Sequence, residues 1–481
     1  MNPRAVLGFT GLLLAVTGLF MALPLGVALW DRDPGATFAY AVSMGAIAVI
    51  ALLFRVLARG AQVALHRKDA LGTVALTWLL LGPVGALPLL LDGAITDPTG
   101  AIFEAVSGFT TTGATVVADV DALSRATNLW RCLMHWIGGM GIVVLFVAVF
   151  PQLGVGAKQL FKTEVPGLPS EGLRPRIRET ATALWWVYLG LTAACAGLLW
   201  LEGMSPYDAV AHAFSTLGTG GFSTRTASVG AWESPWIHWT IAAFMLIAGM
   251  NFGLYYGVLR GRWRDLLQNA ELRFYLLANA VLILAVLVLL GPSRHGLEAT
   301  LREASFQVLA VTTTTGFMTA DFDTYPDFAR LLLWGAMFMG GCAGSTAGGL
   351  KAARVLLLIR LAKREQQATV QPHAVSAVRL GRGAVPEPVL AGVLVFVATF
   401  LGLFALASAV MGALGLDLVT STSAAIACLS SIGPGLAGVG PSQNYAFIPA
   451  IGKLVLCLCM LAGRLEIFAL FAIFTPECWR R

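Results

Sequence analysis

Four short segments of the sequence share a pattern of residues that could bind a dehydrated cation. Each has a weakly apolar stretch followed by a turn of small, mostly Thr, Ser and Gly residues, and each ends on a glycine. The four segments are residues 103–113, 211–221, 306–316 and 423–433. A cation that enters a membrane needs oxygen atoms in place of its hydration shell, and backbone carbonyls around one axis can supply them. Glycine tolerates the backbone angles that turn carbonyls inward, and neighbouring hydroxyls add further oxygens.

The charge pattern of these segments favours ion selection by dipoles. Their turns carry no charged residue. The short helices would direct the negative ends of their dipoles toward the axis, and that field attracts cations. For any single segment, close helix packing by Gly, Ser and Thr explains the pattern equally well. Because four copies lie in the same register, a potassium filter is the better hypothesis.

A glycine-rich stretch could close such a pore. Residues 340–349 read GGCAGSTAGG, in the middle of an otherwise apolar span. Each glycine costs about 1 kcal/mol relative to alanine in a helix interior. We therefore expect this stretch to break the helix and to form a loop at membrane depth. The loop could block or gate the pore below the filter, or it could be a tight helix crossing.

One arginine also lies at an unusual depth. Arg464 is placed inside the last apolar span, close to Glu466. A charge there is costly and is usually functional, so Arg464 could be an electrostatic barrier beside the cation path. It could instead be neutralised by Glu466 or by loop carbonyls as part of the packing. Lys351 and Lys453 are weaker candidates, because either side chain could reach a membrane interface.

Membrane-spanning helices must position these residues. The chain has 481 residues, of which 57% are hydrophobic and 12% are charged, whereas soluble domains have about 25% charged residues. Apolar runs of roughly 20 residues, long enough to cross a bilayer, recur along the chain. Each Gly-ended segment lies between two such runs. Its short helix is too short to span, which is typical of a re-entrant loop.

We therefore predict an all-α membrane protein with ten transmembrane helices and four re-entrant pore loops. Its repeat is an outer helix, a pore helix with its loop, and an inner helix. Two additional helices come first, at 5–30 and 38–55. The predicted units are residues 1–60 for the two N-terminal helices, 61–160 for pore repeat 1, 161–265 for repeat 2, 266–365 for repeat 3 with the gating loop, and 366–481 for repeat 4.

The distribution of charge predicts the orientation of the chain. Most Lys and Arg residues lie at the two termini and in the connections 55–69, 158–179, 260–273 and 354–387. Positive charge resists translocation, so these connections and both termini are expected in the cytoplasm, with acidic loops outside. The net charge of +6 thus reflects topology, and no nucleic-acid partner is expected. The cysteines show no metal-ligand or disulfide spacing.

Two other functions are compatible with parts of the pattern. A symporter that couples potassium to a proton or to sodium would need intramembrane carboxylates or histidines. Glu466 is the only acid that we place well inside a span, and Glu104 lies near the outer end of the first pore helix, so gated passive conduction is favoured. A membrane-embedded serine protease would use Ser345, but the candidate histidines lie nearer the outer helix ends. No enzymatic activity is expected.

Several motifs match a known family. They are FEAVSGFTTTGAT at 103–115, HWIGGMGIVVL at 135–145, RPRIRETA at 174–181, GGCAGSTAGGLK at 340–351, IGPG at 432–435 and LAGRLE at 461–466. The sequence resembles, essentially from end to end, the TrkH membrane subunits of bacterial Trk potassium-uptake systems in the Trk/Ktr/HKT superfamily. The resemblance implies a pseudo-fourfold pore in each protomer of a homodimer in the bacterial inner membrane. It also implies a cytoplasmic TrkA-like ring subunit that binds the nucleotide and controls gating, with no cofactor on this chain.

The same resemblance implies roles for individual residues. Potassium would contact backbone carbonyls of Thr111, Thr112 and Gly113, of Thr219, Gly220 and Gly221, of Thr314, Thr315 and Gly316, and of Ser431, Ile432 and Gly433. The constriction below would comprise Gly340, Gly341, Gly344, Ser345, Gly348, Gly349, Lys351 and Arg464. Thr315 replaces a frequent Ala of the family, and Ser430 and Ser431 replace frequent Asn residues. Because the four loops also differ from one another and lack a GYG triplet, we expect weaker selectivity, with rubidium and sodium as candidate permeants.

Overall fold

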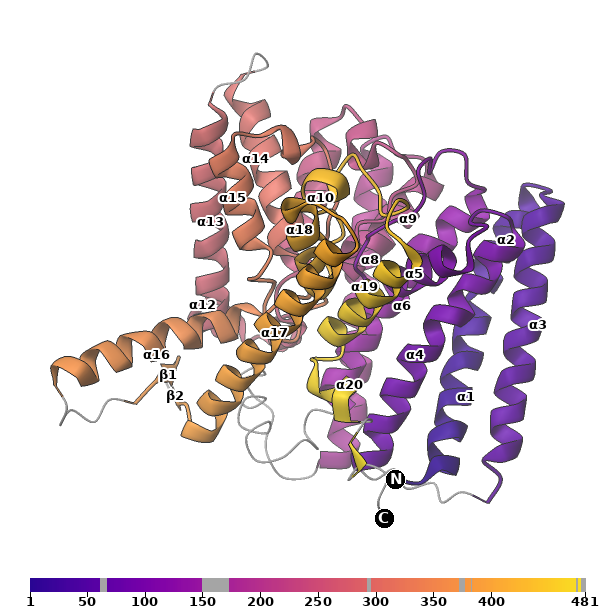
Figure 1. The fold of residues 1–481 in the computed structure, drawn as a ribbon, viewed down its shortest axis with the longest axis horizontal. Coiled ribbons are helices and arrows are strands. Elements are labelled where there is room, and N and C mark those ends of the chain that lie inside the picture. Colours follow the sequence, from indigo (N-terminus) through magenta and orange to yellow (C-terminus); the bar gives the residue numbers. More distant parts are fainter. Residues whose placement is uncertain are drawn as a thin grey trace.

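The computed structural model describes residues 1–60, 67–148, 173–291, 296–371, 377–381, 383–472 and 475–476. Much of the predicted cytoplasmic connection 158–179 and the end of the chain lie outside these residues. Most of the described chain is helical (Figure 1). Besides helices it has a small antiparallel hairpin of β1 (Arg379–Leu380) and β2 (Gly383–Ala384), in which Arg379 is opposite Ala384.

Among the described residues, six helical segments are long and apolar enough to cross a membrane. They are the pair α1 and α2 (Pro3–Phe20 and Ala22–Trp30), α3 (Pro34–Leu57), α4 (Arg67–Leu91), α8 (Leu173–Leu201), α13 (Ala270–Leu290) and α17 (Glu387–Ala413). These segments correspond to the two predicted N-terminal helices and the four predicted outer helices. The chain is therefore a multi-span membrane protein. Its outer helices expose apolar side chains such as Leu284 and Val288, as expected for helices that face lipid.

The predicted inner helices are less regular than the outer ones. They correspond to α6 (Arg125–Ala148), to α10 and α11 (Pro235–Ala248 and Phe252–Leu259), to α15 and α16 (Asp327–Ala336 and Ala352–Val370), and to α19 and α20 (Ala450–Arg464 and Phe468–Ala472). The axes of α10 and α11 differ by 93°, and this pair makes a seventh span if it is counted as one. Within the described residues, length and composition thus support six or seven spans, and the count of ten stays a prediction.

Four short helices lie between the outer and inner helices. They are α5 (Pro98–Phe109), α9 (Pro206–Gly218), α14 (Leu297–Thr312) and α18 (Leu418–Leu429). Each packs against the outer helix that precedes it. Three begin with a side-chain cap, from Asp97, Ser205 and Asp417. Hydrogen bonds from the Thr420 hydroxyl and amide lower the pKa of the Asp417 carboxyl, so this cap stays ionised at neutral pH and favours the positive helix end.

The remaining elements are short. They are α12 (Trp263–Gln268) and the 3₁₀ turns η2 (Ser228–Ala231), η3 (Phe322–Thr324) and η4 (Ala437–Val439). The first span is broken at Met21, because Pro24 has no amide to donate to the carbonyl of Phe20. α16 and the hairpin extend sideways from the bundle, toward the end where the N-terminus lies (Figure 1).

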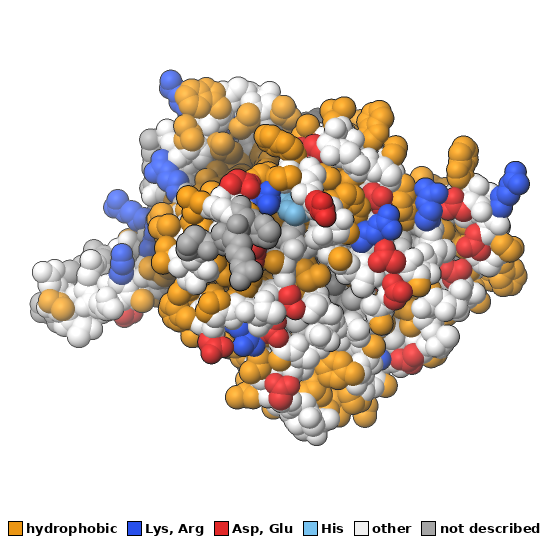
Figure 2. All heavy atoms as spheres, turned by 90° about the horizontal axis from the view of Figure 1, so that it is seen from above, with side chains coloured by type: hydrophobic (Ala, Val, Ile, Leu, Met, Phe, Trp, Pro, Cys, Tyr) orange, Lys and Arg blue, Asp and Glu red, His pale blue; other side chains and the backbone are white. Residues whose placement is uncertain are grey.

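The opposite end of the bundle carries charges of both signs. Figure 2 shows this face, with acidic and basic side chains among hydrophobic ones. In the predicted outer loops, Arg225 pairs with Asp121 at 3.3 Å and Arg330 pairs with Asp323 at 2.7 Å. The acidic outer loops are therefore partly neutralised by their own arginines.

Candidate cation pathway

All four short helices end in the same backbone motif. The residues that take the left-handed conformation are Thr111, Thr219, Thr314 and Ser431, with φ of 54°, 52°, 56° and 57°. In each loop, the amide of this residue bonds to the carbonyl three positions back, and the next amide bonds to the carbonyl five positions back. This is the Schellman pattern, in which glycine usually takes the left-handed position. A Thr or Ser there costs about 1–2 kcal/mol, and such strain persists only where the surrounding structure holds it.

A second left-handed residue follows two positions later in every loop. These residues are Gly113, Gly221, Gly316 and Gly433, with φ of 80°, 82°, 76° and 99°. The residue between the two has a negative φ. The four triplets therefore share one backbone pattern, with a left-handed residue at each end.

The four loops contact one another in a closed ring. A Cβ added to the last glycine of each loop would lie within 3.0 Å of a backbone carbonyl oxygen from the middle of the next loop. The pairs are Gly113 with Gly220, Gly221 with Thr315, Gly316 with Ile432, and Gly433 with Thr112. Each loop thus contacts the next one along the chain, and the fourth loop contacts the first. Only glycine fits at these positions, because both the φ angle and the space exclude a side chain.

The segments that follow the glycines are also joined in a ring. The first and second are joined by the amide of Val120, which donates to Thr226, and the second and third by the amide of Met318, which donates to Ser228. The third and fourth are joined by the amide of Ala437, which donates to Asp323. The amide of Tyr445 donates to the carbonyl of Thr115 and joins the fourth to the first. Neighbouring loops are thus fixed to each other on all four sides.

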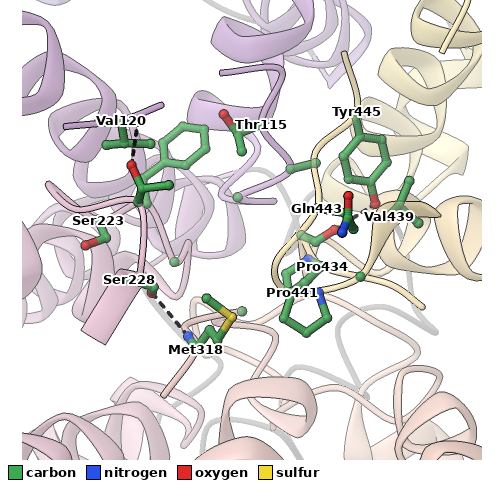
Figure 3. A pocket seen from close by; sticks show the side chains of 18 of the residues that line it. Thr115, Val120, Ser223, Ser228, Met318, Pro434, Val439, Pro441, Gln443 and Tyr445 are labelled. Atoms are coloured by element: carbon green, nitrogen blue, oxygen red, sulfur yellow. Dashed lines mark hydrogen bonds between the residues drawn. The ribbon is translucent and has the colours of Figure 1, made fainter. Parts of the chain in front are cut away.

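A cavity of about 80 Å³ opens above the four glycines, which line it together. Figure 3 shows Thr115, Ser223, Met318 and Pro434 around it, one from each loop. The Tyr445 hydroxyl donates to the Gly433 carbonyl at 2.7 Å. That carbonyl, which the resemblance assigns to the ion, therefore already has one of its lone pairs engaged.

Two hydroxyls of the left-handed residues are buried without a partner among the described residues. They are those of Thr111 and Ser431. Buried polar atoms are nearly always hydrogen-bonded, so such oxygens need an explanation. The Thr219 hydroxyl donates to the Gly218 carbonyl at 2.7 Å, and the Thr314 hydroxyl accepts from the amide of Gly348 at 2.7 Å. Gly348 belongs to the Gly-rich loop (residues 340–349).

The Gly-rich loop interrupts the third inner helix, as its glycine content predicts. It lies between the end of α15 and the start of α16. A Cβ on Gly348 would overlap the carbonyl oxygen of Ser430, so the loop packs against the fourth Gly-ended segment as well as the third. On its other side it enters the bend between α10 and α11. There the amide of Cys342 donates to Gly249 at 2.8 Å, and the amide of Phe252 donates to Gly344 at 3.1 Å.

Arg464 is fully buried against this loop. Its guanidinium donates to the carbonyls of Thr346, at 2.6 Å, and of Gly138, at 3.0 Å. Of the two alternatives for neutralisation, the loop carbonyls are therefore the partners, and Glu466 pairs with Arg354 instead. Gly138 lies in the HWIGG motif of α6, so Arg464 connects the Gly-rich loop to the first inner helix.

The two lysines lie in different places. Lys351 is 5% exposed, and its ammonium donates to the carbonyl of Ala347 within the Gly-rich region, so it does not extend to an interface. Lys453 contacts Asp97 at 3.5 Å near the start of α5. Lys351 therefore remains with the predicted gate, and Lys453 does not. Ser345, the candidate nucleophile, donates to the carbonyl of Cys342.

Sequence reasoning missed a buried ion pair behind the first loop. Arg131 of α6 donates to Glu104 of α5 at 2.8 Å, with side-chain exposures of 2% and 0%. Glu104 also accepts from the amide of Val116, and Arg131 donates to the carbonyl of Ser223. The pair thus supports the segments that follow the first and second glycines. The two residues lie 27 positions apart, and no local sequence pattern relates them.

Glu104 has counterparts in two other loops. His212 and Gln307 also lie nine positions before the last glycine, and each contacts a hydroxyl beyond that glycine, Ser223 at 2.9 Å and Thr319 at 3.0 Å. In three of the four units, therefore, a polar side chain of the short helix bonds to the segment that follows the last glycine of the same loop.

Two acids outside the middle of any predicted span also have buried side chains. Glu104 is completely buried, and Glu271, assigned to a cytoplasmic connection, is 5% exposed in the first turn of α13. Glu104 is paired with Arg131, and Glu271 accepts two backbone amides. Each carboxylate is therefore held by fixed donors.

Removal of Arg131 should destabilise the protein strongly. In Arg131→Met, the Glu104 carboxylate would remain buried without its cation, at a cost of about 3–5 kcal/mol. We expect a clear fall in the apparent melting temperature of the detergent-solubilised protein, followed by tryptophan fluorescence. Arg131→Met combined with Glu104→Gln should recover part of the loss. A single variant as stable as wild type would show that the pair does not support the loops.

Comparisons with known proteins agree with this geometry. The family model TrkH, described as a cation transport protein, matches residues 38–479. The Trk system potassium uptake protein TrkH of Halomonas elongata is 40% identical over 486 residues, and that of Escherichia coli K12 is 39% identical over 492, with both chains covered completely. The crystal structure of the potassium transporter TrkH from Vibrio parahaemolyticus is similar with a TM-score of 0.91 and 37% identity, again over the whole of both chains.

Proposed function

This chain belongs to the TrkH family of cation transport proteins, and from that premise we propose that it conducts potassium through the ring of four loops. The family transports cations and is not a family of enzymes, so the serine-protease alternative is dropped. The observation that carries the proposal is the closed ring of contacts in which each loop glycine faces a carbonyl of the next loop. Four loops around one axis are the arrangement that replaces the hydration shell of a cation.

The proposed filter selects by fixed dipoles. Potassium loses water in the cavity above the glycines and binds to carbonyls of the four triplets. The C-terminal ends of α5, α9, α14 and α18 add negative potential. The unpartnered hydroxyls of Thr111 and Ser431 are candidate oxygens at the inner end. Because the loops differ in sequence, we propose modest selectivity, with rubidium permeating and sodium permeating less readily.

The proposed gate lies below the filter. The Gly-rich loop packs against the third and fourth loops, and Arg464 holds the carbonyl of its residue Thr346. In this position the loop obstructs the path and the arginine repels cations. Opening requires the loop to move away from Thr314 and Ser430.

The remaining proposals concern the assembly. We propose a homodimer in the bacterial inner membrane, with ten spans in each protomer and both termini in the cytoplasm. A cytoplasmic nucleotide-binding ring subunit, similar to TrkA, would control the gate, and no cofactor would bind to this chain. Names such as "Trk system potassium uptake protein" support a multi-component system.

Rubidium uptake into liposomes that hold the purified chain tests the proposed function. Uptake should be competed by external potassium, and it should follow the rubidium gradient and the membrane potential with no dependence on an imposed pH or sodium gradient. Uptake driven by a proton or sodium gradient against the rubidium gradient would favour the symporter. If the chain is silent alone, the same assay with the ring subunit and nucleotide follows, and silence there would contradict the proposal.

A further inference from the structure

A buried carboxylate outside the filter accepts hydrogen bonds from the Gly-rich loop and from the first turn of the helix that follows it. The Oε1 atom of Glu271 accepts a hydrogen bond from the amide of Ala343 at 2.6 Å and another from the amide of Ala353 at 3.1 Å. Ala343 lies within the loop, and Ala353 lies just beyond it, in the first turn of α16. One oxygen atom of α13 therefore contacts both the loop and the start of the helix that follows it. These two are also joined to each other, because the amide of Ala352 donates to the carbonyl of Gly341 at 2.9 Å.

The hydrogen bond from the amide of Ala353 to Glu271 acts as an N-cap of α16. The first amides of a helix have no partner within it, and an acidic or polar N-cap side chain normally accepts from them. In α16 the N-cap residue is Lys351, with a φ of 72° and no side-chain cap. Its ammonium points back to the carbonyl of Ala347. The carboxylate of Glu271 replaces the missing cap from a different helix.

Glu271 is not needed as a cap for its own helix. The side chain of Asn269 already accepts from the amide of Leu272 at 2.8 Å and caps α13. An acid in a first turn often only complements the dipole of its own helix and faces solvent. Glu271 instead is buried and directed to the loop. Its contacts therefore point to a role in the position of the loop.

We propose that Glu271 is the latch of the gate, a positioning residue that keeps the Gly-rich loop under the filter. Loss of its two hydrogen bonds detaches the start of α16 and the loop residue Ala343 from α13. The loop and the start of α16, which the bond from Ala352 to Gly341 joins, can then move together out of the path. Because Glu271 is at the start of α13, a displacement of this helix end would pull on the loop directly. This inference rests on the proposed function, in which the loop is the gate.

The test compares Glu271→Ala with Glu271→Gln in the full-length chain. Glutamine keeps an oxygen that can accept from both amides, whereas alanine has none. The first readout is rubidium uptake into liposomes without any partner. The second is the alkylation rate of Cys342 by a membrane-permeant maleimide, located by peptide mass spectrometry. Cys132, which is also fully buried, is the internal reference in the same sample.

In Glu271→Ala we expect rubidium uptake and Cys342 alkylation each to rise by about tenfold, the effect of losing hydrogen bonds to a charged group. Cys132 should stay unreactive, and Glu271→Gln should resemble wild type. Equal rises at Cys342 and Cys132 would mean general unfolding and would overturn the proposal. So would a reactive Cys342 with unchanged uptake, since the loop would then not be the gate. The Gly113→Ala variant, described below, distinguishes failure of the latch from failure of the conduction proposal. If the four loops do not conduct, Gly113→Ala leaves rubidium uptake and its selectivity unchanged.

Discussion

Gly113→Ala should reduce the discrimination between potassium and sodium by about tenfold or more. A Cβ at this position would overlap the carbonyl oxygen of Gly220, and the φ of 80° is unfavourable for alanine. The first loop must then shift away from the second, at a cost of about 1–2 kcal/mol, which corresponds to a factor of about 5–30 in an equilibrium. The measurement is the concentration of potassium or sodium that halves rubidium uptake into liposomes.

A glycine outside the ring provides the matched control for that substitution. Gly190 lies in α8, and a Cβ there would have no neighbour within 4 Å. Gly190→Ala should therefore leave both the uptake and the competition ratio at the wild-type values. Equal competition ratios in wild type and Gly113→Ala, with both proteins correctly folded, would show that the four glycines do not define the ion path.

Arg464→Ala should increase rubidium uptake by about tenfold or more in the absence of any partner. The substitution removes a buried positive charge below the ring and the hydrogen bond that holds the carbonyl of Thr346. Two unit charges about 10 Å apart repel by about 1.7 kcal/mol at an effective dielectric constant of 20. Loss of this repulsion and of the contact to the loop both favour conduction.

Arg464→Lys separates the charge from the hydrogen bonds. Lysine keeps the positive charge, but it lacks the planar guanidinium that bonds to the carbonyls of both Thr346 and Gly138. Rubidium uptake should therefore rise only slightly. The measurement is rubidium uptake as a function of rubidium concentration for wild type, Arg464→Ala and Arg464→Lys. It distinguishes an effect of the charge from an effect of the hydrogen bonds. If the Arg464→Ala protein takes up no more rubidium than wild type, the barrier role of the charge is contradicted. It is also contradicted if the Arg464→Lys protein takes up as much rubidium as the Arg464→Ala protein.

The local structure of the pathway could be predicted from the sequence. The four Gly-ended segments are short helices followed by turns, because apolar stretches of that length cannot span and the turn residues favour helix ends. Five glycines within residues 340–349 break the third inner helix as their helix propensity predicts. These predictions depend only on neighbouring residues.

Contacts between distant residues could not be predicted in the same way. The closed ring pairs Gly113 with Gly220, and the latch pairs Glu271 with Ala343, although no local pattern relates these positions. Hydropathy placed Glu271 in a polar connection because the residues before it are charged. Its burial depends on the loop that packs over it, and that loop is encoded elsewhere in the chain.

Ion density at the centre of the ring tests the central claim most directly. Crystals of the protein grown or soaked in thallium or rubidium should give an anomalous difference peak on the axis of the four loops. The account predicts that this peak lies among the carbonyl oxygens of the middle residues, Thr112, Gly220, Thr315 and Ile432, and that it weakens in Gly113→Ala. Well-ordered loops without a peak on this axis, or a strong peak elsewhere in the membrane-spanning part, would contradict the account.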